Sequence, residues 1–446
     1  MRKAATKVVP LWTDRFHPHD RIADQRAAYS RDRDRVLYSQ AFRRLAEVTQ
    51  VVHASEGDVF HNRLTHSMKV AQVARRLAEF TREQFQDTAK KLGGPDPEVA
   101  EAAALAHDLG HPPFGHIAEA ELDALLREKK IVEGFEGNAQ SFRIVTQLAD
   151  RNTTHRGLNL TRRTLAAILK YPWGYREKRK LPKSSKKWGY YSTEAADFRF
   201  ARELLPRDSI ERTVEAELMD WADDITYSVH DVEDFYRAGV LPFDQVVVGG
   251  PERERFLAYL TETKDSDATP QAAEKLFTQL FEMVRTAIRY PYTGARAQRI
   301  ALDQLRSQLI FRFVRAIELR DADVTVAIDP ICRGEVEVLK SLMRYYVFDN
   351  PSLVAQQIGQ RNVVRELFAT FYDSVEGGDS KGFVPAPFRD ALDDINNGKF
   401  TEDERRLRRG RLAADIVASL TEAQAVRLHR RICGFELGSV RDMIVW

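Results

Sequence analysis

Apolar residues recur at helical spacing along most of this 446-residue chain, and two clear stripes precede a group of histidines. The first predicts a helix over residues 64–86, which contain no glycine or proline. The second begins at Asp96 and Pro97, a capping residue followed by proline at the first helical position, and predicts a helix that ends near Gly110. The stripe of the first helix comprises Leu64, Val70, Val73, Ala74 and Leu77.

A third long helix, predicted over residues 210–237, has two contrasting faces. Between Glu211 and Asp234 the chain carries nine acids and one basic residue, Arg212, whereas a solvated helix face normally mixes both signs of charge. The excess of acids favours a functional face whose charge is neutralised by a cation or by a basic substrate cradle, with a solvated surface as the alternative. The apolar face comprises Val214, Leu218, Trp221, Ile225 and Val229, and the opposite face Asp220, Asp223, Asp224, Tyr227, Asp231 and Asp234.

Helical patterns dominate the rest of the chain, so we expect an all-α fold with at most short β-hairpins. Further helices are predicted near residues 117–128, 271–290, 295–319, 333–347, 360–373 and 403–418. One short hairpin is expected where residues 50–53 and 58–60 flank Gly57. Two segments have the composition of loops, the lysine- and arginine-rich residues 171–191 and the looser residues 376–387.

The length of the chain exceeds the usual size of a single core, so we expect two regions. Residues 1–240 contain the histidine group and the basic loop, and residues 241–446 form a helical part that completes the pocket and supplies oligomer contacts. Net charge is only +2, which gives no global attraction to nucleic acid. The two cysteines are far apart and offer neither a disulfide framework nor a thiolate metal site. Since no run of 18 apolar residues occurs, we expect no membrane span and a cytoplasmic protein.

Histidines are crowded in one seventh of the chain. Six of the eleven lie between His53 and His116, and neutral histidine is the commonest transition-metal ligand. His107 and Asp108 are adjacent at the end of an apolar helix, where Gly110 and two prolines turn the backbone. The pattern predicts a metal site there, which needs further ligands from other segments.

The candidates for these further ligands are His66 on the preceding helix and an aspartate of the acidic face. A lone histidine at a helix start is more often a cap or a core residue, so the combination of residues carries the prediction. For His53 and His61, in the expected hairpin, we favour a structural role.

Four ordered blocks of sequence resemble a known family. The blocks Asn62–Ser67, Leu105–His116 and Asp223–Ser228 are similar to the three motifs of the HD superfamily. The upstream block Arg31–Leu45, with Thr49-Gln50-Val51 after it, resembles the deoxynucleotide triphosphohydrolases of that superfamily, the dGTPase-like proteins. The resemblance implies the helical HD-domain fold.

The resemblance also implies one divalent ion with four ligands, His66, His107, Asp108 and Asp223. Two imidazoles and two carboxylates suit Mn²⁺, Mg²⁺ or Fe²⁺. Asp224 competes for the last position. We prefer Asp223 because the family places a sugar-contacting tyrosine four residues after its metal aspartate, and Tyr227 fits that spacing.

For substrate, the resemblance implies a deoxynucleoside triphosphate (dNTP) that is hydrolysed to deoxynucleoside and inorganic triphosphate. Arg63 is implied to contact phosphate, and cations of residues 171–191 are candidates for the outer phosphates. Gln50 and Asp231 are implied to lie near the 3′-hydroxyl of the sugar, and Tyr227 against C2′.

By the same resemblance His116 and Glu119 transfer protons. Without it, His116 could equally stabilise the turn, and Glu119 could be a first-turn acid favoured by the helix dipole. His111 is expected in the active-site shell, with a turn-stabilising role as an equal alternative.

Two other functions compete with this one. The first is another HD phosphohydrolase, acting on nucleoside monophosphates, cyclic nucleotides or guanosine polyphosphates. The second is a nucleic-acid-binding or nuclease role that uses the basic loop and the arginine-rich residues 404–411. The family resemblance further implies a homo-oligomer, often a hexamer, a nucleotide effector, and single-stranded nucleic acid as a partner of some members.

Overall fold

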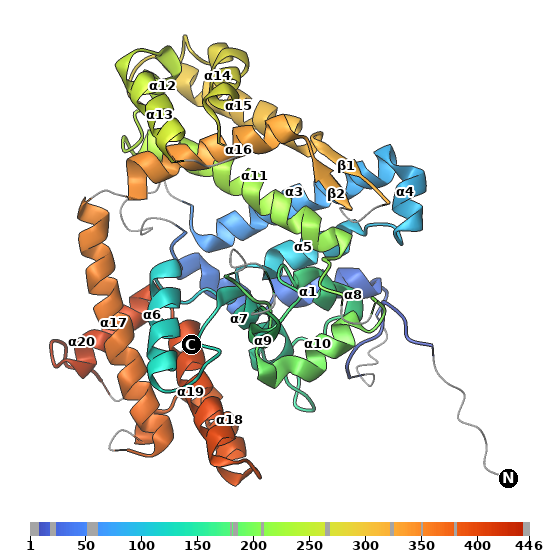
Figure 1. Ribbon diagram of the computed structural model, residues 1–446. Helices are drawn as coiled ribbons and strands as arrows, with labels where there is room; N and C mark the ends of the chain where they lie inside the picture. Colours follow the sequence, from blue (N-terminus) through green and yellow to red (C-terminus); the bar gives the residue numbers. More distant parts are fainter. Residues whose placement is uncertain are drawn as a thin grey trace.

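Three helices form the centre of the molecule. In α5 (Pro97–Ala106), five of the ten residues are alanines and eight residues are buried, so that neighbouring helices approach closely. It packs against α3 (Arg63–Gln84) and α11 (Val214–Arg237), which also contact each other. The side chain of Asp96 caps α5, and Pro97 follows at its first position, as the sequence predicts. Figure 1 shows these helices between an upper and a lower group of helices.

The computed structural model describes residues 9–17, 24–50, 61–178, 181, 186–206, 209–263, 268–321, 325–348, 351–378 and 381–439. In the first half of the chain the other elements are α1 (Ala28–Leu37), α2 (Gln40–Arg44), η1 (Leu45–Glu47), α4 (Gln86–Lys91), α6 (His116–Glu128), α7 (Gly137–Arg143), η3 (Ile144–Leu148), α8 (Arg162–Ile168), α9 (Tyr175–Lys178), η4 (Ser192–Glu194) and α10 (Ala195–Arg202).

The second half contains α12 (Phe243–Val248), α13 (Pro251–Glu262), α14 (Pro270–Gln279), η5 (Phe281–Met283), α15 (Arg296–Val314), β1 (Ile317–Leu319), β2 (Val326–Ile328), α16 (Pro330–Met343), η6 (Arg344–Phe348), α17 (Pro351–Glu376), η7 (Lys381–Phe383), α18 (Ala386–Asn397), α19 (Glu402–Ser419) and α20 (Glu422–Ile432).

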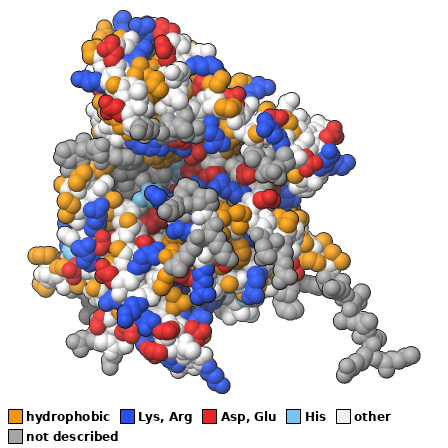
Figure 2. All heavy atoms as spheres, viewed as in Figure 1, with side chains coloured by type: hydrophobic (Ala, Val, Ile, Leu, Met, Phe, Trp, Pro, Cys, Tyr) orange, Lys and Arg blue, Asp and Glu red, His pale blue; other side chains and the backbone are white. Residues whose placement is uncertain are grey.

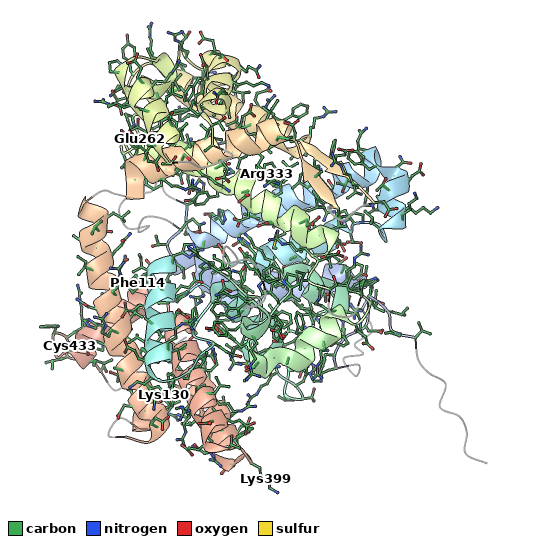
Figure 3. All side chains as sticks on the ribbon, viewed as in Figure 1. Phe114, Lys130, Glu262, Arg333, Lys399 and Cys433 are labelled. Carbon is green, nitrogen blue, oxygen red and sulfur yellow. The ribbon has the colours of Figure 1, made fainter. Side chains whose placement is uncertain are left out.

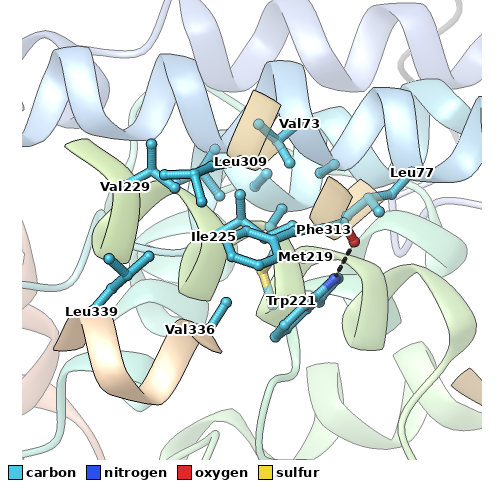
Figure 4. Packing of buried hydrophobic residues seen from close by; sticks show 14 of the residues in the cluster. Val73, Leu77, Met219, Trp221, Ile225, Val229, Leu309, Phe313, Val336 and Leu339 are labelled. Atoms are coloured by element: carbon cyan, nitrogen blue, oxygen red, sulfur yellow. Dashed lines mark hydrogen bonds between the residues drawn. The ribbon is translucent and has the colours of Figure 1, made fainter. Parts of the chain in front are cut away.

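One large apolar core joins α3, α5 and α11 to the upper helices. It extends from Val36 to Val347 and includes α15 and α16, which pack on α11. Figure 4 shows Ile225 and Val229 of α11 among side chains of α3, α15 and α16. The indole N–H of Trp221 is buried in this core and donates to the carbonyl of Phe313 at 3.1 Å.

A second apolar core lies in the lower part of the molecule. It combines α6 with α17, α18, α19 and α20, drawn in orange to red next to α6 in Figure 1. The C-terminal helices therefore pack on the helix that directly follows the histidine-rich turn.

The all-α fold predicted from the sequence is confirmed, since the described strands are only β1 and β2. They form an antiparallel pair in which Glu318 lies opposite Ala327. The predicted helix over 295–319 is wrong at its end, because α15 stops at Val314 and the chain enters β1. The helix predicted over 271–290 is also too long: α14 ends at Gln279, and η5 and turns follow.

Several other boundaries differ from the predicted ones. The helix expected over 360–373 is α17, which starts at Pro351, and the helix expected from 210 starts at Val214 because the Thr213 side chain caps it. Of the hairpin expected over 50–60, residues 51–60, with His53, lie outside the described residues. The segment 171–191 contains the short α9 and two buried aromatic residues, Trp188 and Tyr191, so its described part is more structured than a solvated loop.

The two cysteines differ in environment. Cys332 is buried in α16, whereas Cys433 is exposed directly after α20, where Figure 3 labels it. Among the described residues, no helix has both the length and the apolar character needed to span a membrane.

Candidate metal centre and active site

Three helices bring together the side chains predicted as metal ligands. His66 lies on the first turn of α3, His107 caps the C-terminus of α5, and Asp223 lies in the middle of α11. The Nε2 of His66 is 3.1 Å from Oδ1 of Asp223, and the Nε2 of His107 is 3.6 Å from the same oxygen. One potential ligand atom from each residue lies within 4.8 Å of the other two. The three side chains therefore converge on one point.

The imidazole of His107 is oriented for a ligand. Its Nδ1 lies 2.6 Å from the carbonyl oxygen of Ala104 and donates to it, which leaves the lone pair on Nε2. That Nε2 is buried and has no hydrogen-bond partner among the described residues. A histidine fixed through one ring nitrogen and presenting the other to carboxylates is typical of metal sites. These residues fit a divalent cation.

Asp108 lies beside this cluster and is buried. Its Oδ1 is 3.4 Å from Nε2 of His107 and 3.0 Å from Nδ1 of His111, while its Oδ2 accepts from the guanidinium of Arg63 at 2.8 Å. Burial opposes ionisation, but the electrostatic interactions with His107, His111 and Arg63 hold the pKa of Asp108 well below its usual range. Asp108 is therefore an ionised carboxylate beside the other candidate ligands.

The neighbouring aspartates of α11 point to different partners. Asp223 joins the histidines, and its second oxygen is 3.3 Å from Nζ of Lys170. The Oδ1 of Asp224 instead lies 2.7 Å from Nζ of Lys340 on α16. This arrangement supports Asp223 over Asp224 as the fourth ligand, and the ligand set itself stays a prediction.

A cavity of about 440 Å³ opens over the cluster. Figure 2 shows the face hollowed between the upper and lower helices, with histidine and acidic side chains visible inside the hollow. Of the residues predicted for the site, those lining the cavity are Gln50, Arg63, His107, Asp108, His111, His116, Asp223 and Tyr227, together with Asp224, the competing candidate for the last ligand. Residues to which the sequence assigned no role also line it: Thr49, Asn138, Lys170, and Gln356, Gln357 and Gln360 of α17.

His116 and Glu119 form a pair at the N-terminus of α6. The Nδ1 of His116 is 2.8 Å from Oε2 of Glu119, and the other oxygen of Glu119 accepts from the backbone N–H of Gly137 at 2.8 Å. Although burial opposes it, the hydrogen bond with His116 lowers the pKa of Glu119. The ring of His111 packs edge-on against that of His116, with centroids 5.0 Å apart. The pair is thus a fixed carboxylate with an imidazole exposed beside the cavity.

The predicted sugar-binding residues occupy one side of the site. Tyr227 lines the cavity one turn after Asp223, and Asp231 is buried one further turn along α11, outside the described lining. Burial, together with the charges of Asp234 and Asp223, raises the pKa of Asp231 well above its usual value. One side-chain oxygen of Asp231 and one of Gln50 are buried without a hydrogen-bond partner among the described residues. Such atoms are rare in folded proteins and are available to a bound polar group.

Basic side chains from outside α11 pair with the acidic face of this helix. Lys170 contacts Asp220 at 2.6 Å as well as Asp223, and Arg212 contacts Asp220 at 2.6 Å. His61 lies outside the cavity lining, paired with Asp234 and Lys69, as expected for a structural residue. In the sequence, only its position directly before the basic segment 171–191 could have identified Lys170 as a site residue.

Comparison with known proteins places these residues in a family. The HD domain model matches residues 63–227, and the phosphohydrolase-associated domain model matches residues 326–431. The chain is 35% identical to a deoxyguanosinetriphosphate triphosphohydrolase-like protein of Streptomyces coelicolor over 95% of this chain and 97% of that protein. The chain belongs to the family of dGTPase-like HD proteins. The predicted family membership is therefore confirmed.

Other members are similar over comparable lengths. A protein of the same name from Corynebacterium efficiens is 33% identical over 92% of both chains, and one from Wolinella succinogenes is 29% identical over 94% of this chain and 98% of its own. HD domains are metal-dependent, and the cluster of His66, His107 and Asp223 lies within the matched HD segment. The protein is thus a phosphohydrolase by family, and its cluster of candidate metal ligands lies where the HD motifs meet.

Proposed function

We propose that the protein hydrolyses deoxynucleoside triphosphates to deoxynucleosides and inorganic triphosphate. The observation that carries the proposal is the convergence of His66, His107, Asp108 and Asp223 beneath a cavity that also contains Arg63 and Tyr227. The names of the relatives, which refer to deoxyguanosine triphosphate, support a nucleotide substrate.

The four clustered residues would hold one divalent ion, for which Mn²⁺, Mg²⁺ and Fe²⁺ are the candidates. When bound, such an ion supplies Lewis-acid polarisation of a phosphoryl oxygen. The buried, unpartnered Nε2 of His107 and the ionised Asp108 support this assignment.

Cations of the cavity would neutralise the triphosphate, which carries about four negative charges at neutral pH. Arg63 is held by Asp108 beside the metal position, and Lys170 and Lys187 line the same cavity. Lys187 belongs to the basic segment 171–191, which supports the prediction that this segment contributes to phosphate binding.

Protons would move through His116. Its imidazole is two-thirds exposed, with a side-chain accessibility of 66%, and Glu119 fixes its orientation. In this position the ring exchanges a proton with the reacting oxygen atoms, namely those of the attacking water and of the leaving deoxynucleoside. The lowered pKa of Glu119 keeps the carboxylate ionised, so that it stabilises the protonated imidazole.

Selection of the sugar would depend on Tyr227 and Gln50. The ring of Tyr227 occupies the cavity wall one turn from Asp223, where it would collide with a ribose 2′-hydroxyl. The unpartnered oxygen of Gln50 would accept from the 3′-hydroxyl, with Asp231 behind it. A site with buried polar atoms matched to a hydroxyl rejects analogues that lack it.

Product analysis of the purified protein tests the proposal. With Mn²⁺ and each dNTP in turn, with and without a second dNTP, we expect triphosphate and deoxynucleoside, and much slower turnover of ribonucleotides and dideoxynucleotides. Release of pyrophosphate or orthophosphate would contradict it, and turnover of monophosphates or cyclic nucleotides would favour another HD phosphohydrolase activity.

The role of His116 is tested separately. We expect His116→Ala to lower kcat by about 10²- to 10⁴-fold, as for loss of a general acid or base, while the content of bound metal stays at the wild-type level. His155→Ala, in an exposed loop, is the matched control and retains full turnover. Full activity of His116→Ala would remove His116 from the mechanism.

The arginine-rich residues 404–411 offer no support for nucleic-acid binding as a second function. Arg406 pairs with Asp403, Arg409 with Glu376, and Arg411 is buried against the ring of Tyr191. Arg405 donates to backbone carbonyls around Gly398, and Arg408 lies over the ring of Phe400. The family expectations of a homo-oligomer, a nucleotide effector and a nucleic-acid partner stay predictions.

A further inference from the structure

The start of α20 contacts two walls of the cavity. Glu422, its first residue, is buried with 3% of its surface exposed. Its Oε1 accepts from the backbone N–H of Thr49 at 2.8 Å and from the backbone N–H of Phe114 at 3.0 Å. Its Oε2 accepts from the hydroxyl of Thr49 at 2.6 Å. One carboxylate of the C-terminal region thus joins two segments that are 65 residues apart in the HD region.

A buried arginine makes a parallel connection. The guanidinium of Arg44 donates to the carbonyls of Leu109 at 2.9 Å and His111 at 2.7 Å, and to that of Leu420 at 3.2 Å. Leu420 is the C-terminal cap of α19, two residues before Glu422. The junction between α19 and α20 is therefore bound to the turn that carries Asp108 and His111.

Both segments held by Glu422 lead directly to predicted site residues. Thr49 precedes Gln50 and pairs with Asn62, which caps α3 just before Arg63 and His66. Phe114 has a φ of 66°, a conformation that is uncommon for a residue other than glycine, and Gly115 with a φ of 59° follows it. His116 begins α6 immediately afterwards. Figure 3 labels Phe114 at this end of α6.

We propose that Glu422 is a positioning residue for the phosphohydrolase reaction, fixing the backbones of Thr49 and Phe114 and through them the side chains of Gln50 and His116. Glu422 does not line the described cavity, so it acts through these neighbours. A carboxylate is suited to this task because two oxygens can satisfy three buried donors at once. The phosphohydrolase-associated region thereby supplies part of the active-site geometry of the HD domain.

The positive φ of Phe114 explains how loss of the contact with Glu422 would affect the active site. A strained residue persists only where its surroundings hold it, and the N–H of Phe114 is fixed by Glu422. Release of this N–H lets the backbone before α6 relax, which moves the imidazole of His116 relative to the metal position. Misplacement by about 1 Å at a reacting group costs about 100-fold in rate.

The test compares three substitutions of Glu422 in the full-length protein. Glu422→Ala removes every acceptor, Glu422→Asp keeps the charge but is one methylene too short to reach both segments, and Glu422→Gln keeps an oxygen for the two N–H groups. Glu404→Ala is the matched control, because Glu404 belongs to the exposed capping box of α19 in the same region and is remote from the cavity.

Two readouts are measured below the unfolding temperature of each variant. The first is kcat and KM for the best dNTP with Mn²⁺, and the second is hydrogen exchange at the amides of Thr49 and Phe114. For Glu422→Ala we expect kcat to fall about 10- to 100-fold and both amides to exchange faster. Glu422→Asp should be intermediate, and Glu422→Gln and Glu404→Ala should resemble the wild type.

Wild-type kcat and KM in folded Glu422→Ala would overturn the proposal, as would equal losses in Glu422→Ala and Glu422→Gln. If Glu422→Ala does not fold, Glu422→Asp is compared with Glu422→Gln. A lower kcat in Glu422→Asp alone supports the proposal, and equal losses in the two variants overturn it. The inference concerns rates in the proposed function, but its structural part is independent of the substrate. A wild type that releases no triphosphate would contradict the proposed function alone, while exchange at Thr49 and Phe114 would still support or overturn the role of Glu422.

Discussion

At the scale of single residues, adjacent aspartates of α11 have separate roles. Asp223 faces His66 and His107, whereas Asp224 faces Lys340. Consecutive residues on a helix differ by about 100° in direction, so one helix can supply a metal ligand and an ion pair from neighbouring positions.

This difference gives a matched pair of variants. We expect Asp223→Asn to lower bound Mn²⁺ and turnover by at least about 10- to 100-fold, because an amide oxygen is a weaker ligand than a carboxylate. Asp224→Asn should keep the wild-type metal content, since its side chain pairs with Lys340 and not with the histidines. Elemental analysis after dialysis, together with product assays, measures both. Equal metal loss in the two variants would show that Asp223 is not the specific ligand.

The sequence predicted the motif residues of the site but not their neighbours. His66, His107, Asp108 and Asp223 were found because their order resembles a family, and the structure brings them together. Lys170, Gln356 and Gln360 reach the cavity from segments that match no motif. Their place depends on tertiary packing, which local pattern does not encode.

At the scale of elements, the turn between α5 and α6 is packed too closely for any side chain at Gly110. A Cβ there would overlap the carbonyl oxygen of Gly137 and the backbone nitrogen of Ser141 on α7. The N–H of Gly110 donates to the hydroxyl of Ser141 at 2.9 Å, which fixes the turn that carries Asp108 and His111.

We therefore expect Gly110→Ala to lower the free energy of unfolding by about 2–4 kcal/mol, through overpacking and displacement of the turn, and to abolish turnover. Gly359→Ala, within α17, is the control: its Cβ meets no atom within 4 Å, so the helix should gain about 0.5–1 kcal/mol. Urea unfolding of both variants is the measurement. Wild-type stability in Gly110→Ala would show that the turn is looser than described.

The connection between α11 and β2 gives a pH-dependent contribution to stability. Glu217 accepts from the N–H of Val326 at 2.9 Å, and burial raises the pKa of Glu217 to about 7 from 4.5. The folded state thus holds this proton more tightly than the unfolded state, so the contribution is complete below pH 4.5 and is lost as pH rises through 7.

Between pH 5 and 8 we expect the free energy of unfolding of the wild type to fall by about 1–2 kcal/mol relative to that of Glu217→Gln. This value is smaller than the full pKa shift implies, because the side chain is partly exposed and solvent screens its charge. Unfolding in urea at several pH values measures the difference. Glu262→Gln, at an exposed position of α13, is the control. Parallel pH profiles for the wild type and Glu217→Gln would exclude a raised pKa.

Among the elements, long helices with one apolar face were predicted well, and short or evenly buried ones were missed. α7 begins with Gly137-Asn138, residues with poor helix propensity, and forms because Glu136 caps it and its neighbours bury it. The strand β1 was included in a helix because Ile317 and Leu319 continue the apolar pattern of α15, and the antiparallel pairing with β2 decides the outcome.

At the scale of the whole molecule, buried polar contacts join the two apolar cores. Asp415 of α19 is fully buried and accepts from Arg143 and Gln140 of α7, each at 2.8 Å. The contacts of Glu422 and Arg44 lie on the same boundary. The C-terminal helices are therefore bound to the part of the molecule that carries the candidate metal ligands by charged groups as well as by apolar packing.

We expect a single calorimetric unfolding transition for the full chain. Asp415→Ala should lower stability by about 3–5 kcal/mol because it leaves the charge of Arg143 buried without this partner. Asp394→Ala, which breaks the exposed pair with Arg156, should change stability by less than about 1 kcal/mol. Two well-separated transitions in the wild type would show that the cores unfold independently.

The contrast between the two cysteines allows the native protein to be labelled at a single natural site. Burial raises the pKa of the Cys332 thiol to about 12, so this thiol stays protonated and shielded, while Cys433 is exposed at the end of α20. Because the thiolate is the reacting species, a maleimide dye should attach to Cys433 alone in the native protein. Its fluorescence anisotropy would then report movement of the helix that begins at Glu422, without any engineered residue.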